Sequence, residues 1–278
     1  MSLSTAIVSA GIEYECGVSN TRLQNVKRFF RRWGLESHIT DQHDGSVDVL
    51  RPASFNPSVY SNWRTNAEIT FWSDKKIDLA HFLLYMNKAG AVTNITTGMH
   101  VHFKFESMPK ALAVFSSCAV RKRFDDAYLT FARTQEMASW DLARRLRSHY
   151  ASGICDHDTV IRQLRATSHY DGSRYRQINL ATFYRTGTIE VRVLPGMPYP
   201  QDKLALFWLI KTMTSLYNRY KDKPAILDNY AKLVAKISLT YPDHLNGWMR
   251  FFSTSPLDAD ERTRVENILA ARQAPIRR

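Results

Sequence analysis

The sequence predicts an α+β fold, in which short two-faced strands form a sheet and a helical part follows. Two observations support this prediction. Several short segments alternate polar and apolar residues with the period of two that is typical of half-buried strands, whereas everything after Pro200 has helical periodicity. The 278 residues, 44% of them hydrophobic, are enough to bury a core as one large domain or two small ones.

The first predicted strand covers residues 6–16 and ends in Gly-Ile-Glu-Tyr-Glu. Alternation places Glu13 and Glu15 on one face of this strand and apolar side chains, including that of Cys16, on the other. A helix is predicted next, because its apolar residues recur at helical spacing as far as residue 33, where Gly34 can end it.

A hairpin is predicted after this helix. Its two short strands, 36–40 and 46–50, flank Asp44 and Gly45, a dipeptide that is typical of tight turns between paired strands. The following residues, 51–62, contain two prolines and many small polar side chains, so they are expected to form a loop.

Strands and helices alternate in the middle of the chain. Strands are predicted at 67–71 and 98–105, with a helix between them at 74–89. Helical periodicity then covers about 109–150, with a break expected near Lys122, and a shorter helix is expected at 156–167.

The strand predicted over 186–193 alternates polar and apolar residues for eight positions. Prolines follow it and end the strand. Four helices are then expected from periodicity, at 201–220, 224–237, 244–252 and 258–273.

Four of the predicted strands present acids or histidines on one face and apolar residues on the other. If these strands share one sheet, four carboxylates converge and need a counter-charge. Ligands dominated by carboxylate oxygen suit Mg²⁺ or Mn²⁺, and one histidine can be accommodated. A neighbouring guanidinium makes the set suitable for phosphoryl chemistry, although the P-loop pattern is missing. The polar residues are Glu13 and Glu15, Glu68, His100 and His102, and Glu190 with Arg192.

The composition of the chain bears on which partners it can bind and in which cellular compartment it works. The net charge of +12 makes a polyanion a possible partner without choosing one. No apolar run is long enough to cross a bilayer, and the N-terminus lacks the features of a signal peptide. The three cysteines are widely spaced, so we expect no disulfide framework and a reducing cytoplasm.

Several pieces of the chain, in order, resemble one family. The resemblance is to the amidoligases, the carboxylate–amine ligases of the glutamine synthetase and glutamate–cysteine ligase superfamily, and covers roughly residues 6–220. The chain differs from the family after Glu68, because it lacks the serine and proline that usually follow this glutamate. The matching pieces are GIEYE (11–15), DGS (44–46), AEITF (67–71), TGMHVHF (97–103), RYRQINL (174–180) and TGTIEVRVLPG (186–196).

This resemblance implies a curved, mostly antiparallel sheet with helices on its outer face. It implies a catalytic domain over 1–220 and a helical C-terminal extension, 221–278, packed on it. One metal ion would be held by Glu13, His100 and Glu190, and a second by Glu15 and Glu68. The phosphate and nucleotide would be contacted by Arg192, Arg176, Asn179 and Arg147, with Asp44 lining the pocket and Arg145 beside Arg147.

The function implied is ATP-dependent formation of an amide or isopeptide bond through an acyl phosphate. ATP, Mg²⁺ or Mn²⁺, an amino-acid-like carboxylate and an amine acceptor are the expected partners, with Arg192, Glu190 and Glu15 as catalytic residues. Two alternatives stay open: a nucleic-acid-binding or virion-associated protein that keeps the fold without turnover, and a metal-dependent hydrolase. A cytoplasmic location is expected, in a bacterium or, for a phage protein, in the host cytoplasm or the virion; the oligomeric state is not predicted.

Overall fold

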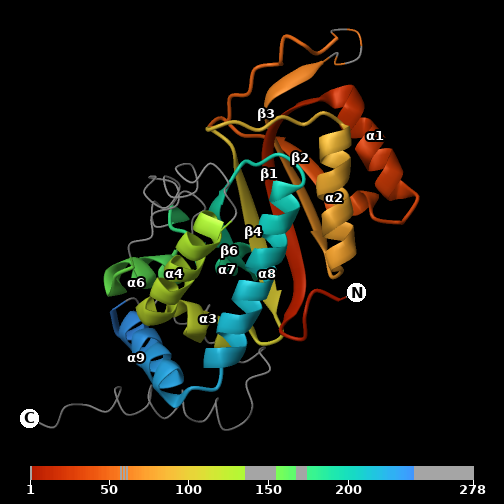
Figure 1. Cartoon of the computed structure of the whole chain (residues 1–278). Helices are drawn as coiled ribbons and strands as arrows, with labels where there is room; N and C mark the ends of the chain where they lie inside the picture. The colour runs from red at the N-terminus through yellow and green to blue at the C-terminus, as the bar shows by residue number, and fades with distance from the viewer. Residues whose placement is uncertain are drawn as a thin grey trace, which may run out of the picture.

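A computed structural model of the chain describes residues 2–56, 58, 60, 62–134, 155–166 and 174–240. The fold is α+β, as predicted. Among the described residues, six strands form one open, antiparallel sheet in the order β2-β3-β1-β4-β6-β5 (Figure 1). The strands are β1 (Ile7–Ser19), β2 (Ile39–His43), β3 (Trp63–Ser73), β4 (Gly98–Phe105), β5 (Ile178–Asn179) and β6 (Ile189–Pro195).

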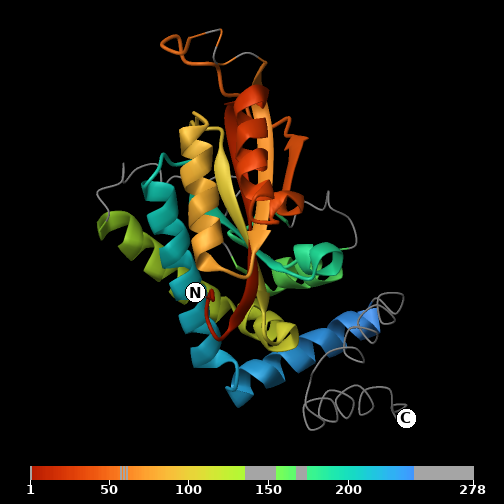
Figure 2. The same ribbon diagram turned by 90° about the vertical axis from the view of Figure 1, so that its right-hand side faces the viewer.

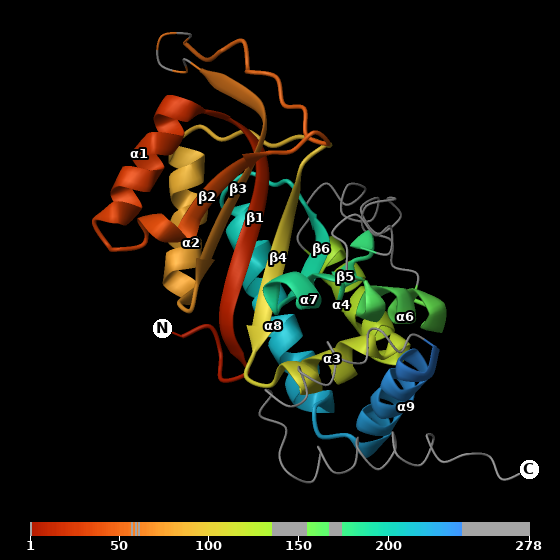
Figure 3. The same cartoon turned by 180° about the vertical axis from the view of Figure 1, so that it is seen from behind.

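Helices cover one face of this sheet. Figures 1 and 2 show α1, α2 and α8 on that face, and Figure 3 looks onto the opposite face, where β1, β3 and β4 are seen in front of them. We call this second face the open face. The described helices are α1 (Asn20–Arg31), α2 (Lys76–Lys88), α3 (Met108–Ser116), α4 (Cys118–Thr134), α6 (His157–Arg165), α7 (Thr182–Thr186), α8 (Gln201–Tyr220) and α9 (Pro224–Thr240).

The core lies between the sheet and these helices. Phe71 of β3 stacks on Phe82 of α2, with ring centroids 5.0 Å apart. The ring of Phe30 on α1 also lies 5.0 Å from that of Phe71. At the other end of the sheet, the ring of Phe105 on β4 lies 4.8 Å from that of Tyr217 on α8. The apolar residues of each strand therefore point to the helices, and the alternate polar residues point to the open face.

Several elements have the predicted positions. β4 and α8 have the bounds expected from the sequence, 98–105 and 201–220, and the strand expected at 67–71 is the centre of β3. The strand expected at 186–193 begins only at Ile189, because Gly187 has a left-handed φ of 67° and ends α7.

The predicted hairpin is wrong. Residues 36–38 form a 3₁₀ turn, β2 pairs with β3, and 46–50 form no strand. Asp44 accepts hydrogen bonds from the backbone N–H and the hydroxyl of Ser46, so the dipeptide makes a local Asx turn rather than joining two paired strands. Backbone hydrogen bonds from Asp44 and Val49 go instead to the edge of β3.

The expectation of no disulfide is also wrong. Cys118, at the start of α4, and Cys155, just before α6, form a disulfide with their Cα atoms 5.5 Å apart. The pair is 37 residues apart in sequence, and only the packing of α6 beside α4 brings the two thiols together. The cysteine argument for a reducing compartment therefore no longer holds. Cys16 is buried in the core, as expected.

The helical stretch predicted over 109–150 is divided at residue 117 into α3 and α4. The break expected near Lys122 is wrong, because α4 continues through that residue, and the end of the stretch lies outside the described residues. The helix expected at 156–167 is α6, whose N-cap Asp156 accepts a hydrogen bond from the backbone of Thr159. The helices expected at 244–252 and 258–273 lie outside the described residues. Within the described part of the chain, no helix has both the length and the apolar character that crossing a bilayer requires.

Candidate metal centre

The polar residues singled out in the sequence meet on the open face. Strands β3, β1, β4 and β6 are consecutive neighbours in the sheet, so the prediction that they share one sheet is confirmed. Their register aligns the polar positions: Glu15 lies opposite Glu68, Glu13 opposite His100, and His102 opposite Glu190. Side chains that are far apart in the sequence are therefore adjacent on one surface.

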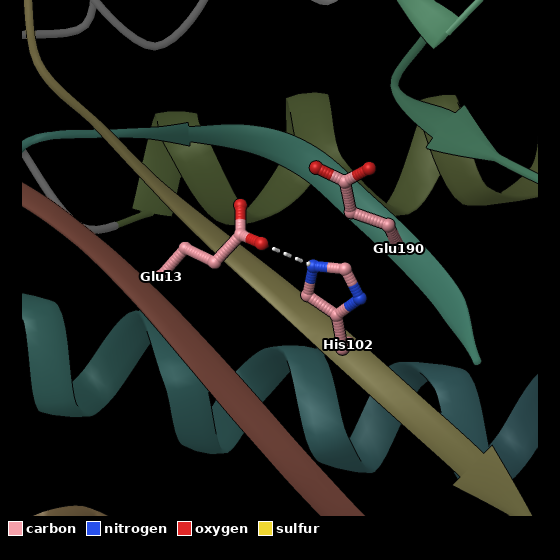
Figure 4. A group of neighbouring side chains, drawn as sticks. All are labelled: Glu13, His102 and Glu190. Carbon is pink, nitrogen blue, oxygen red and sulfur yellow. Dashed lines mark hydrogen bonds and ion pairs between the residues drawn. The ribbon is translucent and has the colours of Figure 1, made fainter. Parts of the chain in front are cut away.

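One cluster consists of Glu13, His102 and Glu190, from three different strands (Figure 4). Each residue offers one ligand atom, and these atoms all lie within 4.8 Å of one another. Nε2 of His102 lies 2.9 Å from Oε1 of Glu13. We call this group the first cluster.

The orientation of His102 is fixed from both sides of its ring. Nδ1 lies 2.9 Å from the hydroxyl of Thr188, which directs Nε2 into the first cluster. Burial lowers the pKa of His102, but the charge and hydrogen bond of Glu13, together with the charge of Glu190, outweigh burial and raise this pKa to about 9. The pKa of Glu13 is in turn held well below its ordinary value, because His102 and His100 outweigh the effect of burial.

Glu190 is almost fully buried, and two partners hold its carboxylate. The amide of Asn179 on β5 donates to Oε2 over 2.6 Å, and the guanidinium of Arg192 contacts Oε1 at 2.5 Å. Burial raises the pKa of Glu190, but Arg192 and His102 outweigh it, so the pKa is lowered. Glu190, which is buried, and Arg192, which is partly buried, therefore form an ion pair at the edge of the first cluster.

His100 lies between two groups of acids and is buried, with 2% of its side chain exposed. Its Nδ1 is 3.2 Å from Glu13 and 3.5 Å from Glu190, and its Nε2 is 3.5 Å from Glu15. The resemblance to amidoligases implies that His100 is the metal ligand, whereas alternation alone puts both histidines on this face, and the assignment stays a prediction. The structure adds His102 as a second candidate ligand at the same place.

A second cluster consists of Glu15, Glu68 and Asp44, again with ligand atoms within 4.8 Å of one another. Glu15 accepts a hydrogen bond from the backbone N–H of Gly98, and Glu68 accepts one from the amide of Gln42. Burial and the charge of Glu13 raise the pKa of Glu68 to about 8. At neutral pH, the second cluster therefore keeps a proton that a cation would displace.

The remaining predicted residues are distributed as follows. Asn179 and Arg192 contact the first cluster through Glu190. A terminal nitrogen of Arg176 lies 3.5 Å from the hydroxyl of Thr159 on α6, and Arg176 belongs to neither cluster. Arg145 and Arg147 lie outside the described residues.

Two residues of the site were missed by the sequence analysis. Thr188 shares the polar parity of Glu190, so the alternation already places it on the open face, but nothing in the pattern pairs it with His102. Gln42 was missed because the strand before Asp44 was predicted to end at residue 40, whereas β2 continues to His43. Pairing of β2 with β3 then puts Gln42 directly opposite Glu68.

The donor set suits hard divalent cations. The two clusters offer five carboxylates and one imidazole, with His100 between them, and carboxylate oxygens are the ligands that Mg²⁺ and Mn²⁺ prefer. His102 and Arg192 supply only part of the balancing positive charge, since the pKa of Glu68 remains raised. This arrangement fits one cation at each cluster.

Comparisons of this chain with protein-family models, with curated proteins and with solved structures find no match.

Proposed function

We propose that the protein is an ATP-dependent carboxylate–amine ligase that uses two divalent cations. One observation carries the proposal: two acid clusters lie side by side on one sheet face, and the partly buried guanidinium of Arg192 contacts one of them. The resemblance of the sequence to amidoligases supports the same activity. The finer fold, a glutamine-synthetase-like catalytic domain over 1–220 with a C-terminal extension, belongs to this proposal.

The described residues have distinct parts in this function. Glu13, Glu190 and a histidine would hold one cation, and Glu15, Glu68 and Asp44 the other. Bound Mg²⁺ would neutralise the phosphate oxygens of ATP and orient the terminal phosphoryl group. Arg192 is held in place by Glu190 and lies 5.9 Å from the ring of Tyr175, so its guanidinium is positioned before any substrate arrives.

The proposed reaction has two steps. An oxygen of the substrate carboxylate attacks the terminal phosphorus of ATP, giving an acyl phosphate and ADP. The nitrogen of an amine then attacks the acyl carbon, phosphate leaves, and the amine loses a proton as the amide forms. No protein nucleophile is needed, so the chain's contribution is to position the reactants and to stabilise charge.

A trapping assay tests this proposal. The full chain is incubated with ATP, Mg²⁺ and single amino acids or dicarboxylates, and hydroxylamine serves as the amine. We expect ADP and a hydroxamate to form in equal amounts, and both to disappear in EDTA and in Glu190→Gln. Val191→Ala is the matched control, because its side chain faces the opposite side of the same strand. Hydrolysis of an ester or amide substrate without ATP would instead identify a metal-dependent hydrolase.

A further inference from the structure

The helical side of the molecule has a basic groove between α1 and α2. These helices lie next to each other in Figures 1 and 2. The groove has a volume of about 380 Å³, and it is lined by cationic and aromatic side chains with no acid among them. The lining residues that matter here are Arg22, Arg28, Phe29, Arg32, Tyr85 and Lys88.

The two helices that line this groove supply no acid that balances its charge. α1 has no acidic residue, and Asp78, the acid of α2, is buried and accepts a hydrogen bond from Ser73. Other cations of α1 do have partners, since Lys27 contacts Asp41 and Arg31 contacts Glu36.

The cations of the groove itself differ from these. Among the described residues, Arg28 contacts no carboxylate, and its guanidinium donates a hydrogen bond to the amide oxygen of Asn25. Arg32 and Lys88 are exposed, and in the described part of the chain neither contacts a carboxylate. Arg22 lies over the ring of Tyr60 at 5.3 Å. A concave surface with unpaired cations attracts a ligand that has several negative charges.

Aromatic rings accompany these cations. Phe29 and Tyr85 stack with centroids 3.6 Å apart, and Lys88 lies 5.0 Å from the Tyr85 ring. Trp33, two residues after the end of α1, lies beside the groove: its ring is 4.7 Å from that of Phe29, and 46% of its surface is exposed. Cations along a groove with an accessible ring beside them are the combination that binds single-stranded nucleic acid, where phosphates and bases are both available.

We propose that this basic groove binds single-stranded nucleic acid. Arg22 lies on α1 and Arg32, ten residues later, is the C-cap residue of this helix, so the helical rise places them about 15 Å apart and allows contact with more than one phosphate. The bases of a duplex are stacked inside it, so they would not be available to stack on the ring of Trp33. The groove and the metal centre lie on opposite faces of the sheet, as the contact of Phe30 with Phe71 requires, so this inference does not rest on the proposed ligase activity.

Fluorescence anisotropy with a labelled twelve-nucleotide single strand tests the proposal on the full chain. The triple variant Arg28→Ala, Arg32→Ala, Lys88→Ala should bind at least tenfold more weakly. Its plot of log affinity against log salt should be flatter by about 2, since each phosphate contact on a single strand contributes about 0.7. Trp33→Ala should weaken binding roughly tenfold without changing the slope, because stacking releases no counterions.

A matched control removes the same charge elsewhere. Lys122, Arg123 and Lys232 are exposed residues of α4 and α9, and replacing all three by alanine should leave affinity within about twofold. Equal losses in the two triple variants would show a non-specific charge effect and overturn the proposal. Equal competition by a duplex of the same length, or displacement by poly-glutamate at the same charge concentration, would overturn it in favour of a general polyanion surface.

Discussion

Nε2 of His102 lies 2.9 Å from Oε1 of Glu13, while the other ring nitrogen of His102 lies 2.9 Å from Thr188. This geometry resembles that of a metal-binding histidine, whose second nitrogen is held by a neighbouring polar group. His100, assigned from the sequence, instead contacts the acids of both clusters.

The two histidines should therefore have different effects on metal binding. We expect two Mn²⁺ ions to bind. His102→Ala should lower the affinity for one of them ten- to a hundredfold, because the substitution removes a ligand from the first cluster alone. His100→Ala should lower the affinity for both ions, since His100 contacts Glu13 of the first cluster and Glu15 of the second. Calorimetric titration with Mn²⁺ measures both affinities. If His102→Ala leaves both unchanged and His100→Ala removes one, His100 is the ligand that the sequence indicated.

The two faces of β6 separate metal binding from folding. Glu190→Gln should reduce the rise in melting temperature that Mg²⁺ causes, because the variant lacks one negative ligand and the partner charge of Arg192. Val191→Ala should lower the melting temperature by a core truncation of about 1–3 kcal/mol while keeping the Mg²⁺-dependent rise. Thermal unfolding with and without Mg²⁺ measures both effects. If Mg²⁺ raises the melting temperature of Glu190→Gln as much as that of the wild type, Glu190 is not a metal ligand.

The sequence predicts the faces of the strands better than their neighbours. Alternation places Glu13, His102 and Glu190 on one face, because side-chain parity is a local property of a strand. Which strands lie side by side is decided by contacts between distant segments. For this reason the hairpin at Asp44 was predicted wrongly, although Asp44 does reach the second cluster through the turn that replaces it.

Replacing two glycines, Gly11 and Gly196, by alanine should have different effects on stability. A Cβ on Gly11 would lie 3.7 Å from both His102 and Trp72, which is ordinary contact, so Gly11→Ala should leave stability within about 0.5 kcal/mol. The methyl group would nevertheless fill the space between these two side chains and should lower ligase turnover. A Cβ on Gly196 would meet Thr97 at 1.9 Å, so Gly196→Ala should destabilise the fold by about 1–3 kcal/mol. Urea unfolding and ADP release measure the two effects; a large loss of stability in Gly11→Ala would contradict the register of β1.

Asp202 should make stability depend on pH. Burial raises its pKa from 3.8 to about 6, and its Oδ2 has no hydrogen-bond partner among the described residues. Between about pH 4 and 6 the folded chain therefore keeps a proton that the unfolded chain has lost, and stability falls as pH rises. Asp202→Asn removes this loss, so the variant should gain stability relative to the wild type from pH 4 to pH 7. Melting curves at both values provide the test, and a difference that does not change with pH would show that Asp202 is ionised throughout.

The disulfide between Cys118 and Cys155 should contribute measurably to stability, because it closes a loop between α4 and α6. For a separation of 37 residues, loop-closure entropy predicts about 4 kcal/mol. Reductant should therefore lower the melting temperature of the wild type but not that of the double variant Cys118→Ser, Cys155→Ser, which should unfold near the reduced wild type. Cys16 is the internal control, since it is buried and free. Titration of thiols in denaturant without reductant should give one reactive group per chain; three groups and an unchanged melting temperature would show that the bond does not form in solution.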